Sequence, residues 1–204
     1  MKMGPSNILE HRKTIESAEG STLETSPFRE CLTKCDTKII NINATDFGGV
    51  TDDMAIHIHK VKGVEDKNRP ALIYFHGGAF CFFSAKLSAP WACQVAINAN
   101  ATVFGVDYGV APEIKAPGGG LNCYAATKYI TQNAHIFNVD PKRIAIFGES
   151  SGGNMTACCS MELAKRSESH LVKFAWMDIA FVSNHWFSRT KENSSEREWV
   201  SLEG

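Results

Sequence analysis

The chain has 204 residues, of which 44% are hydrophobic and 21% are charged, the composition of a globular domain with a buried core. Its formal net charge of −1 argues against the strongly basic surface with which proteins bind nucleic acid or anionic membranes. No apolar run has transmembrane length, and Met1 to Glu19 is too polar for a secretory signal peptide.

Seven cysteines, without a paired C-x-x-C pattern, favour a reducing intracellular compartment, and the chain is expected in the cytoplasm. Cys31 and Cys35 are too isolated to indicate a zinc site. Four further cysteines lie in apolar surroundings and are expected to pack as small buried hydrophobic side chains: Cys81, Cys93, Cys158 and Cys159. No metal or organic cofactor is predicted.

Residues 1–36 form a mixed, polar stretch and predict a peripheral N-terminal arm or part of a cap, with a helix from Ile8 to Glu19. Residues 37–204 are expected to form the main domain, beginning with a strand at Lys38–Asn43 and a turn at Asp46–Gly49.

Met54–Lys60 alternates apolar and polar residues and predicts a half-exposed strand. His57 and His59 fall on its polar face. A His-x-His pair can bind a metal ion, but on such a strand we expect both rings to be solvated.

Apolar runs of strand length alternate with helical segments from Pro70 to Val182, which predicts an α/β fold with a largely parallel sheet and helices on both faces. The predicted strands are Pro70–Phe75, Thr102–Val106, Ile144–Phe147 and Leu171–Val182. The predicted helices lie within Ser84–Asn100, Leu121–Asn133 and Asn154–Lys165. Gly118–Gly120 lacks the lysine and the preceding strand of a phosphate-binding loop.

The segment Gly148-Glu-Ser-Ser-Gly152 matches G-x-S-x-G between a predicted strand and a predicted helix. This order places Ser150 on a sharp turn, as a nucleophile elbow requires. Gly148 and Gly152 remove side chains that would collide with the flanking strand and helix. A helix-capping loop rich in serine would give the same letters; the strand before and the helix after favour the elbow.

His76-Gly-Gly78 follows another buried strand, so it is expected at the same edge of the sheet as Ser150. An acyl-transfer serine needs N–H donors for the oxyanion, and we predict Gly77, Gly78 and Ser151 as these donors. His76 precedes the glycines, and bracing the loop is a more plausible role for its ring than acting as general base.

Three segments resemble the hormone-sensitive-lipase-like branch of the α/β-hydrolases, which includes arylacetamide-deacetylase-type esterases. They are His76-Gly-Gly-Ala-Phe80, Asp107-Tyr-Gly-Val-Ala-Pro-Glu113 and the run from Asp140 to Asn154. The branch usually has H-G-G-G-[FW], D-Y-R-L-A-P-E and D-P-x-R-I-x-[IV]-x-G-D-S-A-G-G-N. The resemblance implies a serine carboxylesterase acting on small acyl esters, with Ser150 as nucleophile.

The sequence departs from the branch at several positions. Ala79 replaces the third glycine, Glu149 and Ser151 replace Asp and Ala, and Gly109 replaces an arginine, so that a structural ion pair is expected to be lost. The resemblance also implies a later acid motif and a later histidine motif, and neither is present. Asp178 and His185 are poor candidates for these roles, because the family places the two partners on separate loops.

Relative to the family fold, the last strands and helices are absent, and Val172–Val182 is predicted to be an exposed hydrophobic edge. Trp186 and Phe187 add apolar surface. The chain is then a fragment of a longer one, or has a covering partner such as a second copy, or folds poorly. Three functions stay open: an esterase that is weak or inactive as this chain, a non-catalytic hydrolase-like ligand-binding protein, and an interaction protein using the sheet edge.

Overall fold

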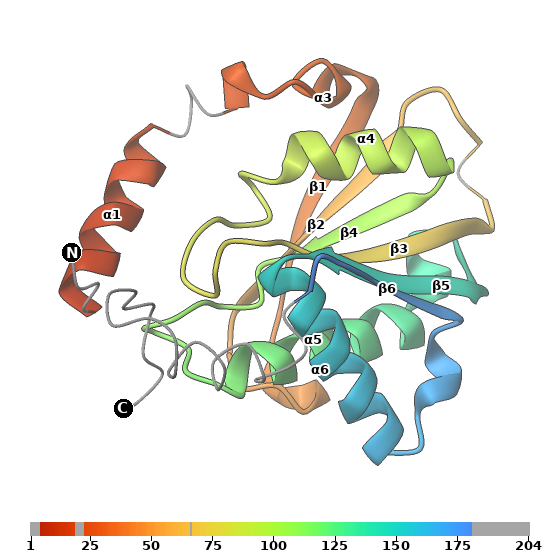
Figure 1. The fold of residues 1–204 in the computed structure, drawn as a ribbon. Helices are drawn as coiled ribbons and strands as arrows, with labels where there is room; N and C mark the ends of the chain where they lie inside the picture. Colours follow the sequence, from red (N-terminus) through yellow and green to blue (C-terminus); the bar gives the residue numbers. More distant parts are fainter. Residues whose placement is uncertain (1–4, 19–22, 66, 181–204) are drawn as a thin grey trace.

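The computed structural model describes residues 5–18, 23–65 and 67–180, in which six strands form one sheet in the order β1-β2-β4-β3-β5-β6 (Figure 1). The strands are β1 (Cys35–Ile42), β2 (Met54–Val61), β3 (Arg69–Phe75), β4 (Thr102–Val106), β5 (Val139–Glu149) and β6 (Phe174–Asp178). The helices are α1 (Pro5–Ser17), α3 (Cys31–Lys34), α4 (Ala89–Ala99), α5 (Gly118–Gln132) and α6 (Ser151–Lys165), with short 3-10 helices at Ala44–Phe47, Ala134–Phe137 and Ser169–Leu171.

The sheet changes from antiparallel to parallel at β4. β1, β2 and β4 pair antiparallel, whereas β4, β3, β5 and β6 run parallel. Phe75 at the end of β3 lies opposite Val106 of β4 and Gly148 of β5. The carboxyl ends of these strands therefore share one edge, and the predicted α/β fold with a largely parallel sheet is confirmed.

The central strands are buried because helices cover both faces of the sheet. α4 lies on one face, and α5 and α6 lie on the other (Figure 1). Ile73, Phe104 and Ile146 contribute to the core under α5 and α6, while Tyr74 and Val103 pack under α4. The continuous apolar run of β3 follows from this double burial.

The prediction that β2 is half exposed is wrong. His57 is only 5% exposed and His59 is fully buried. Two neighbouring strands flank β2 in the sheet, and α4 packs on the face that carries both rings. In the described ranges, no group of three or more His, Cys, Asp or Glu side chains is arranged to hold a metal ion.

Two helices begin earlier than the sequence predicts. α5 begins at Gly118 rather than Leu121, and α6 begins at Ser151 rather than Asn154. The glycines in these first turns suit close packing: a Cβ added to Gly120 would stand 3.0 Å from the Cβ of Cys158. Close helix packing here outweighs the low helix propensity of glycine.

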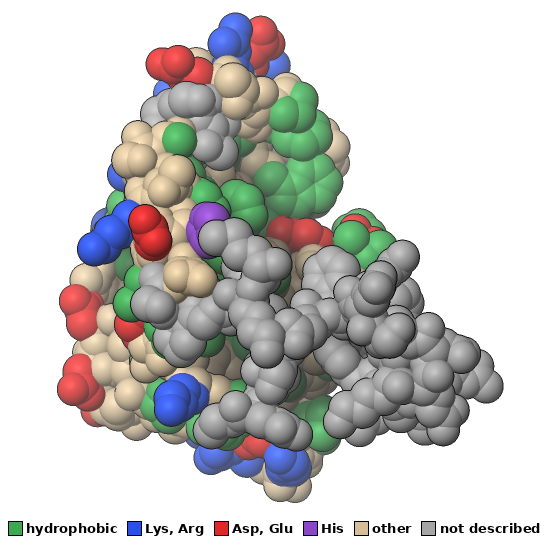
Figure 2. All heavy atoms as spheres, turned by 60° about the vertical axis from the view of Figure 1, so that its left-hand side comes forward, with side chains coloured by type: hydrophobic (Ala, Val, Ile, Leu, Met, Phe, Trp, Pro, Cys, Tyr) green, Lys and Arg blue, Asp and Glu red, His purple; other side chains and the backbone are tan. Residues whose placement is uncertain are grey.

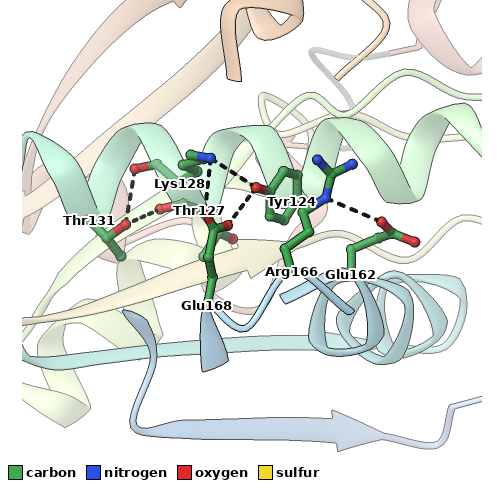
Figure 3. A network of polar contacts seen from close by, with 7 residues as sticks. All are labelled: Tyr124, Thr127, Lys128, Thr131, Glu162, Arg166 and Glu168. Atoms are coloured by element: carbon green, nitrogen blue, oxygen red, sulfur yellow. Dashed lines mark hydrogen bonds and ion pairs between the residues drawn. The ribbon is translucent and has the colours of Figure 1, made fainter. Parts of the chain in front are cut away.

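A polar network joins α5 to the segment that follows α6 (Figure 3). The hydroxyl of Tyr124 donates to Oε2 of Glu168 at 2.5 Å, and Nζ of Lys128 pairs with Oε1 at 2.9 Å. The guanidinium of Arg166 lies over the Tyr124 ring, 4.6 Å from its centroid. These contacts fix the end of α6 that lies away from Ser150.

α1 stands apart from the sheet, next to the loops that follow β3 and β4 (Figure 1). Figure 2 brings this side forward and shows side chains of both charges along the margins, with hydrophobic patches between them. Within the described residues, no helix combines the length and hydrophobicity needed to cross a lipid bilayer.

β6 is an edge strand whose apolar side chains face outward. Among the described residues it pairs only with β5, and its Phe174 and Trp176 are 63% and 52% exposed. The predicted hydrophobic edge is therefore present, although the strand is shorter than Leu171–Val182. His185, Trp186 and Phe187 lie outside the described residues.

Candidate active site

Ser150 lies on a sharp turn between β5 and α6, as the sequence predicts, with φ of 56° and ψ of −121°. A Cβ on Gly152 would stand 2.0 Å from the carbonyl oxygen of Phe75, and one on Gly148 would stand 2.5 Å from the same atom. Both positions therefore require glycine. The N–H of Ser150 donates to the carbonyl of Asp178 at 2.9 Å, so the end of β6 also holds the turn.

The two adjacent serines differ in exposure. Ser150 is partly exposed, whereas Ser151 is fully buried at the start of α6. The N–H groups in the first turn of a helix have no partner within the helix, and they carry the positive end of its dipole. The N–H of Ser151 is thus available to an anionic oxygen next to Ser150.

The loop after β3 lies directly beside the elbow. A Cβ on Gly77 would come within 3.5 Å of the Cβ of Ser150. Gly78 has a φ of 131°, and its added Cβ would stand 2.1 Å from the carbonyl of Phe82, so this position also requires glycine. The structure brings together the two segments that the sequence places at one edge of the sheet.

Gly77 differs from its predicted role. Its N–H, expected to face an oxyanion, donates to Oε1 of Glu149 at 2.8 Å, which removes Gly77 from the candidate donors. The N–H groups of Gly78 and Ala79 have no partner in the described part of the chain. Ala79, at the position of the third glycine of the motif, therefore takes the place of Gly77 as a candidate, since a backbone N–H does not require glycine. The sequence analysis did not include it among the donors.

Glu149 links the loop to the sheet. Its Oε1 also accepts from the hydroxyl of Tyr74 at 2.8 Å, while Oε2 is buried without a partner among the described residues. Burial raises the pKa of Glu149, although the N–H of Gly77 and the hydroxyl of Tyr74 both donate to the carboxylate. Glu149, which precedes Ser150 in G-x-S-x-G, thus has a structural role that its position in the sequence did not reveal.

His76 braces the loop, as expected. Its Nδ1 lies 2.7 Å from the carbonyl of Gly77, and since a carbonyl only accepts, Nδ1 donates. The ring stacks on Tyr108 at 4.5 Å, and the Tyr108 hydroxyl donates to the carbonyl of His76 at 2.8 Å. Burial lowers the pKa of His76 and so favours the neutral ring.

Asp107 fixes the far end of the same loop. Its Oδ1 accepts from the N–H of Ala85 at 2.5 Å, and its Oδ2 lies 3.4 Å from Nε2 of His57. Burial would raise the pKa of Asp107, but the contacts with His57 and Ala85 outweigh it and the pKa is lowered. Sequence reasoning missed this pair because His57 was expected in solvent.

The segment that contains Gly109 makes an ion pair through a different residue. Glu113, in the same segment, pairs with Arg12 of α1, whose Nη1 lies 2.7 Å from each of the two carboxylate oxygens. Nothing in the sequence pattern joins Arg12 to a residue so far along the chain.

No histidine is hydrogen-bonded to Ser150 Oγ in residues 5–18, 23–65 and 67–180. His170 precedes β6 and so belongs to the opposite edge of the parallel sheet. Asp178 ends β6 at the Ser150 edge, but His185 lies outside the described residues, so the expectation that this pair does not complete a triad stays a prediction.

Comparison with known proteins gives matches to one family and to its members. The family described as alpha/beta hydrolase fold matches residues 72–201. Carboxylesterase NlhH of Mycobacterium tuberculosis is 36% identical over 111 residues, which are 54% of this chain and 34% of that protein. Human arylacetamide deacetylase-like 2 is 35% identical over 129 residues, covering 59% of this chain and 31% of that protein.

Solved structures agree with the sequence matches. A bacterial heroin esterase superposes with a TM-score of 0.77 at 25% identity, covering 95% of this chain and 58% of that one. An esterase of Pyrobaculum calidifontis gives 0.70 at 27% identity, covering 83% and 52%. The chain thus spans about a third to somewhat more than half of the length of these relatives.

Proposed function

We propose that this chain, which belongs to the α/β hydrolase fold family and to its hormone-sensitive-lipase-like branch, carries the nucleophile and the oxyanion donors of a serine carboxylesterase. Relatives named as carboxylesterases and esterases give the lineage. The proposed substrates are small acyl esters. The observation that carries the proposal is the strained, partly exposed Ser150 next to the loop of Gly78 and Ala79 and to Ser151, whose N–H groups have no partner among the described residues.

In the proposed reaction, Ser150 Oγ attacks the ester carbonyl and forms a tetrahedral intermediate. The N–H groups of Gly78, Ala79 and Ser151 would bind its negative oxygen, and one such donor is typically worth about 3 to 4 kcal/mol of barrier. Loss of the alcohol leaves an acyl-enzyme, which water then hydrolyses.

The proton transfers in this sequence need a general base, and the described residues supply none next to Ser150. We therefore expect the 204-residue chain to turn over esters weakly or not at all. A site without its base keeps the part of catalysis that comes from oxyanion binding. Tetrahedral adduct formation is for this reason a better test than turnover.

The test is binding of phenylethaneboronic acid, which forms a tetrahedral adduct with a serine oxygen. We expect saturable binding by calorimetry, and at least tenfold weaker binding for Ser150→Ala. The matched control is Ser160→Ala, further along α6, whose hydroxyl donates to the carbonyl of Thr156 at 2.8 Å. Binding that is unchanged in Ser150→Ala would overturn the proposal.

The absence of a base next to Ser150 in the described residues also favours a second candidate, a hydrolase-like protein that binds a small molecule without chemistry. Turnover of 4-nitrophenyl acetate separates the two. Slow turnover that disappears in Ser150→Ala supports the esterase, whereas saturable binding without turnover supports the second candidate.

A further inference from the structure

We propose that Arg12 of α1 is a positioning residue that holds the oxyanion loop, defined here as residues 76–84, in the conformation that presents its N–H groups. The inference rests on the proposed function of Ser150, because it assigns a task to the loop beside that residue. It gives the N-terminal arm a specific role in the site.

The contacts of Arg12 join three segments of the chain. Its Nε donates to the carbonyl of Cys81 at 3.0 Å, its Nη1 pairs with both carboxylate oxygens of Glu113, and its Nη2 donates to the carbonyl of Ala111. The Arg12 side chain is only 14% exposed. A planar, forked guanidinium suits such divergent acceptors, which the single ammonium of lysine cannot serve together.

The oxyanion loop needs to be held because its backbone is strained. Ala79, Phe80 and Phe83 all have left-handed backbone, with φ of 51°, 66° and 66°. L-residues with side chains rarely adopt this region, and they remain there only where the surroundings impose it. The loop conformation therefore depends on contacts from other parts of the molecule.

Those contacts are spaced along the loop. The N–H of Ala111 donates to the carbonyl of Phe80 at 2.8 Å, and Asp107 accepts from the N–H of Ala85. Arg12 holds the carbonyl of Cys81, between these two points. Arg12 also binds the carbonyl of Ala111, the residue whose N–H donates to Phe80. The guanidinium therefore connects the loop after β3 to the loop after β4, next to the backbone hydrogen bond that already joins them.

The contact of Arg12 with Cys81 affects the proposed N–H donors through the backbone of the loop. The N–H groups of Cys81 and Phe82 both donate to the carbonyl of Gly78, at 3.1 and 2.8 Å. The orientation of this carbonyl sets the peptide plane that contains the N–H of Ala79. Release of Cys81 is thus expected to turn a donor away from Ser150.

The charge arrangement supports the same role. Glu113 is 53% exposed, and the Arg12 guanidinium lowers its pKa. Gly109 supplies no side chain. Among the described residues, the positive charge beside Glu113 is the guanidinium of Arg12 on α1. The arm therefore contributes both the charge partner of the loop after β4 and the anchor of the loop after β3.

The first experiment is amide hydrogen exchange on the full 204-residue chain with Arg12→Ala and Arg12→Lys, and with Lys13→Ala on the same helix as a matched control. We expect exchange in residues 78–83, measured at the hydrogen-bonded amides of Cys81 and Phe82, to accelerate about tenfold or more in both Arg12 variants. Exchange in α5, and that of the control variant, should stay unchanged, which shows that the domain is folded.

The second measurement asks whether the loop acts on the site. Binding of phenylethaneboronic acid should weaken at least about fivefold in Arg12→Ala, and millimolar guanidinium, but not methylammonium, should restore part of it and of the loop protection. Unchanged exchange in residues 78–83 overturns the proposal. If the wild type does not bind the boronic acid, the proposed function fails while the exchange and rescue data still decide the role of Arg12.

Discussion

The clusters on the two faces of the sheet differ in size and in composition. Under α5 and α6 the core is one large, almost wholly apolar cluster that includes Ile56, Ile73 and Ile146. Under α4 the apolar cluster is smaller, and His59 is buried beside it, with its Nδ1 3.5 Å from Sγ of Cys93, a member of the cluster. The first face is therefore expected to dominate stability, and the second to make it depend on pH.

The largest expected effect tests the closest contact on the α5–α6 face. Gly152→Ala would put a Cβ 2.0 Å from the carbonyl oxygen of Phe75. This clash is with a backbone atom, so the backbone of α6 or of β3 would have to shift. We expect a loss of more than about 4 kcal/mol, seen as little soluble protein or a collapsed urea midpoint.

Gly119→Ala in α5 is the matched control, because its nearest neighbours would lie at 3.2 to 3.4 Å. A Gly152→Ala variant that unfolds at the wild-type urea concentration would show that the approach of α6 to β3 is looser than described.

A pair of neighbours on β3 compares the faces directly. Ile73 is fully buried toward α5 and α6, whereas Leu72 is partly buried and packs toward α4. Ile73→Ala should cost about 3 to 5 kcal/mol, because it leaves a cavity in the larger cluster. Leu72→Ala should cost about 1 to 2 kcal/mol. If both variants lower the free energy of unfolding in urea by the same amount, the cluster under α5 and α6 does not contribute more to stability than the cluster under α4.

His59 should make the α4 face sensitive to acid. Burial, with a smaller effect of His57, lowers the pKa of His59 to about 4. The unfolded chain then binds more protons between pH 6.5 and 4, so this contribution is complete above pH 6.5 and is lost as pH falls toward 4, by about 3 kcal/mol at most.

Urea midpoints at pH 7.5 and pH 5 measure this effect. The pH dependence should shrink in His59→Leu and persist in His135→Leu, since His135 is exposed. The same slope in His59→Leu and in wild type would assign the acid sensitivity to other groups.

The smallest expected effect concerns the polar rim of the α5–α6 face (Figure 3). Tyr124→Phe removes the hydroxyl that contacts Glu168 and Lys128, at an expected cost of about 1 kcal/mol in thermal or urea unfolding. Tyr129→Phe is the control, since that ring makes aromatic contacts with Phe47 and Phe137. If Tyr124→Phe lowers the free energy of unfolding no more than the control does, the network does not contribute to stability.

The difference between the faces also explains what the sequence could predict. The runs of β3, β4 and β5 identified a parallel sheet because strands buried on both faces leave a continuous apolar pattern. In β2, alternation correctly separated two faces, but periodicity cannot say what covers the polar one. A helix from elsewhere in the chain covers it, and His57 and His59 are buried.

In the candidate site, too, the sequence predicts local features but not long-range contacts. The elbow at Ser150 could be predicted, because its glycines and flanking elements are adjacent in sequence. The bond from Gly77 to Glu149 and the contacts of Arg12 join residues 72 and about 100 positions apart, and no local pattern encodes them. Because of such a long-range contact, the N–H of Gly77 is bound to Glu149 and is not a candidate oxyanion donor, and Ala79 takes its place.

The long reach of Arg12 has a consequence for synthesis on the ribosome. Its partners Cys81, Ala111 and Glu113 lie 69, 99 and 101 residues further along the chain. At roughly 5–20 residues per second, translation of such a stretch takes about 5 to 20 s. α1 has 13 residues, a length at which an isolated helix is only marginally stable. α1 therefore leaves the ribosome before its binding partners, and it is exposed to chaperones and proteases until the loops that it anchors have been made.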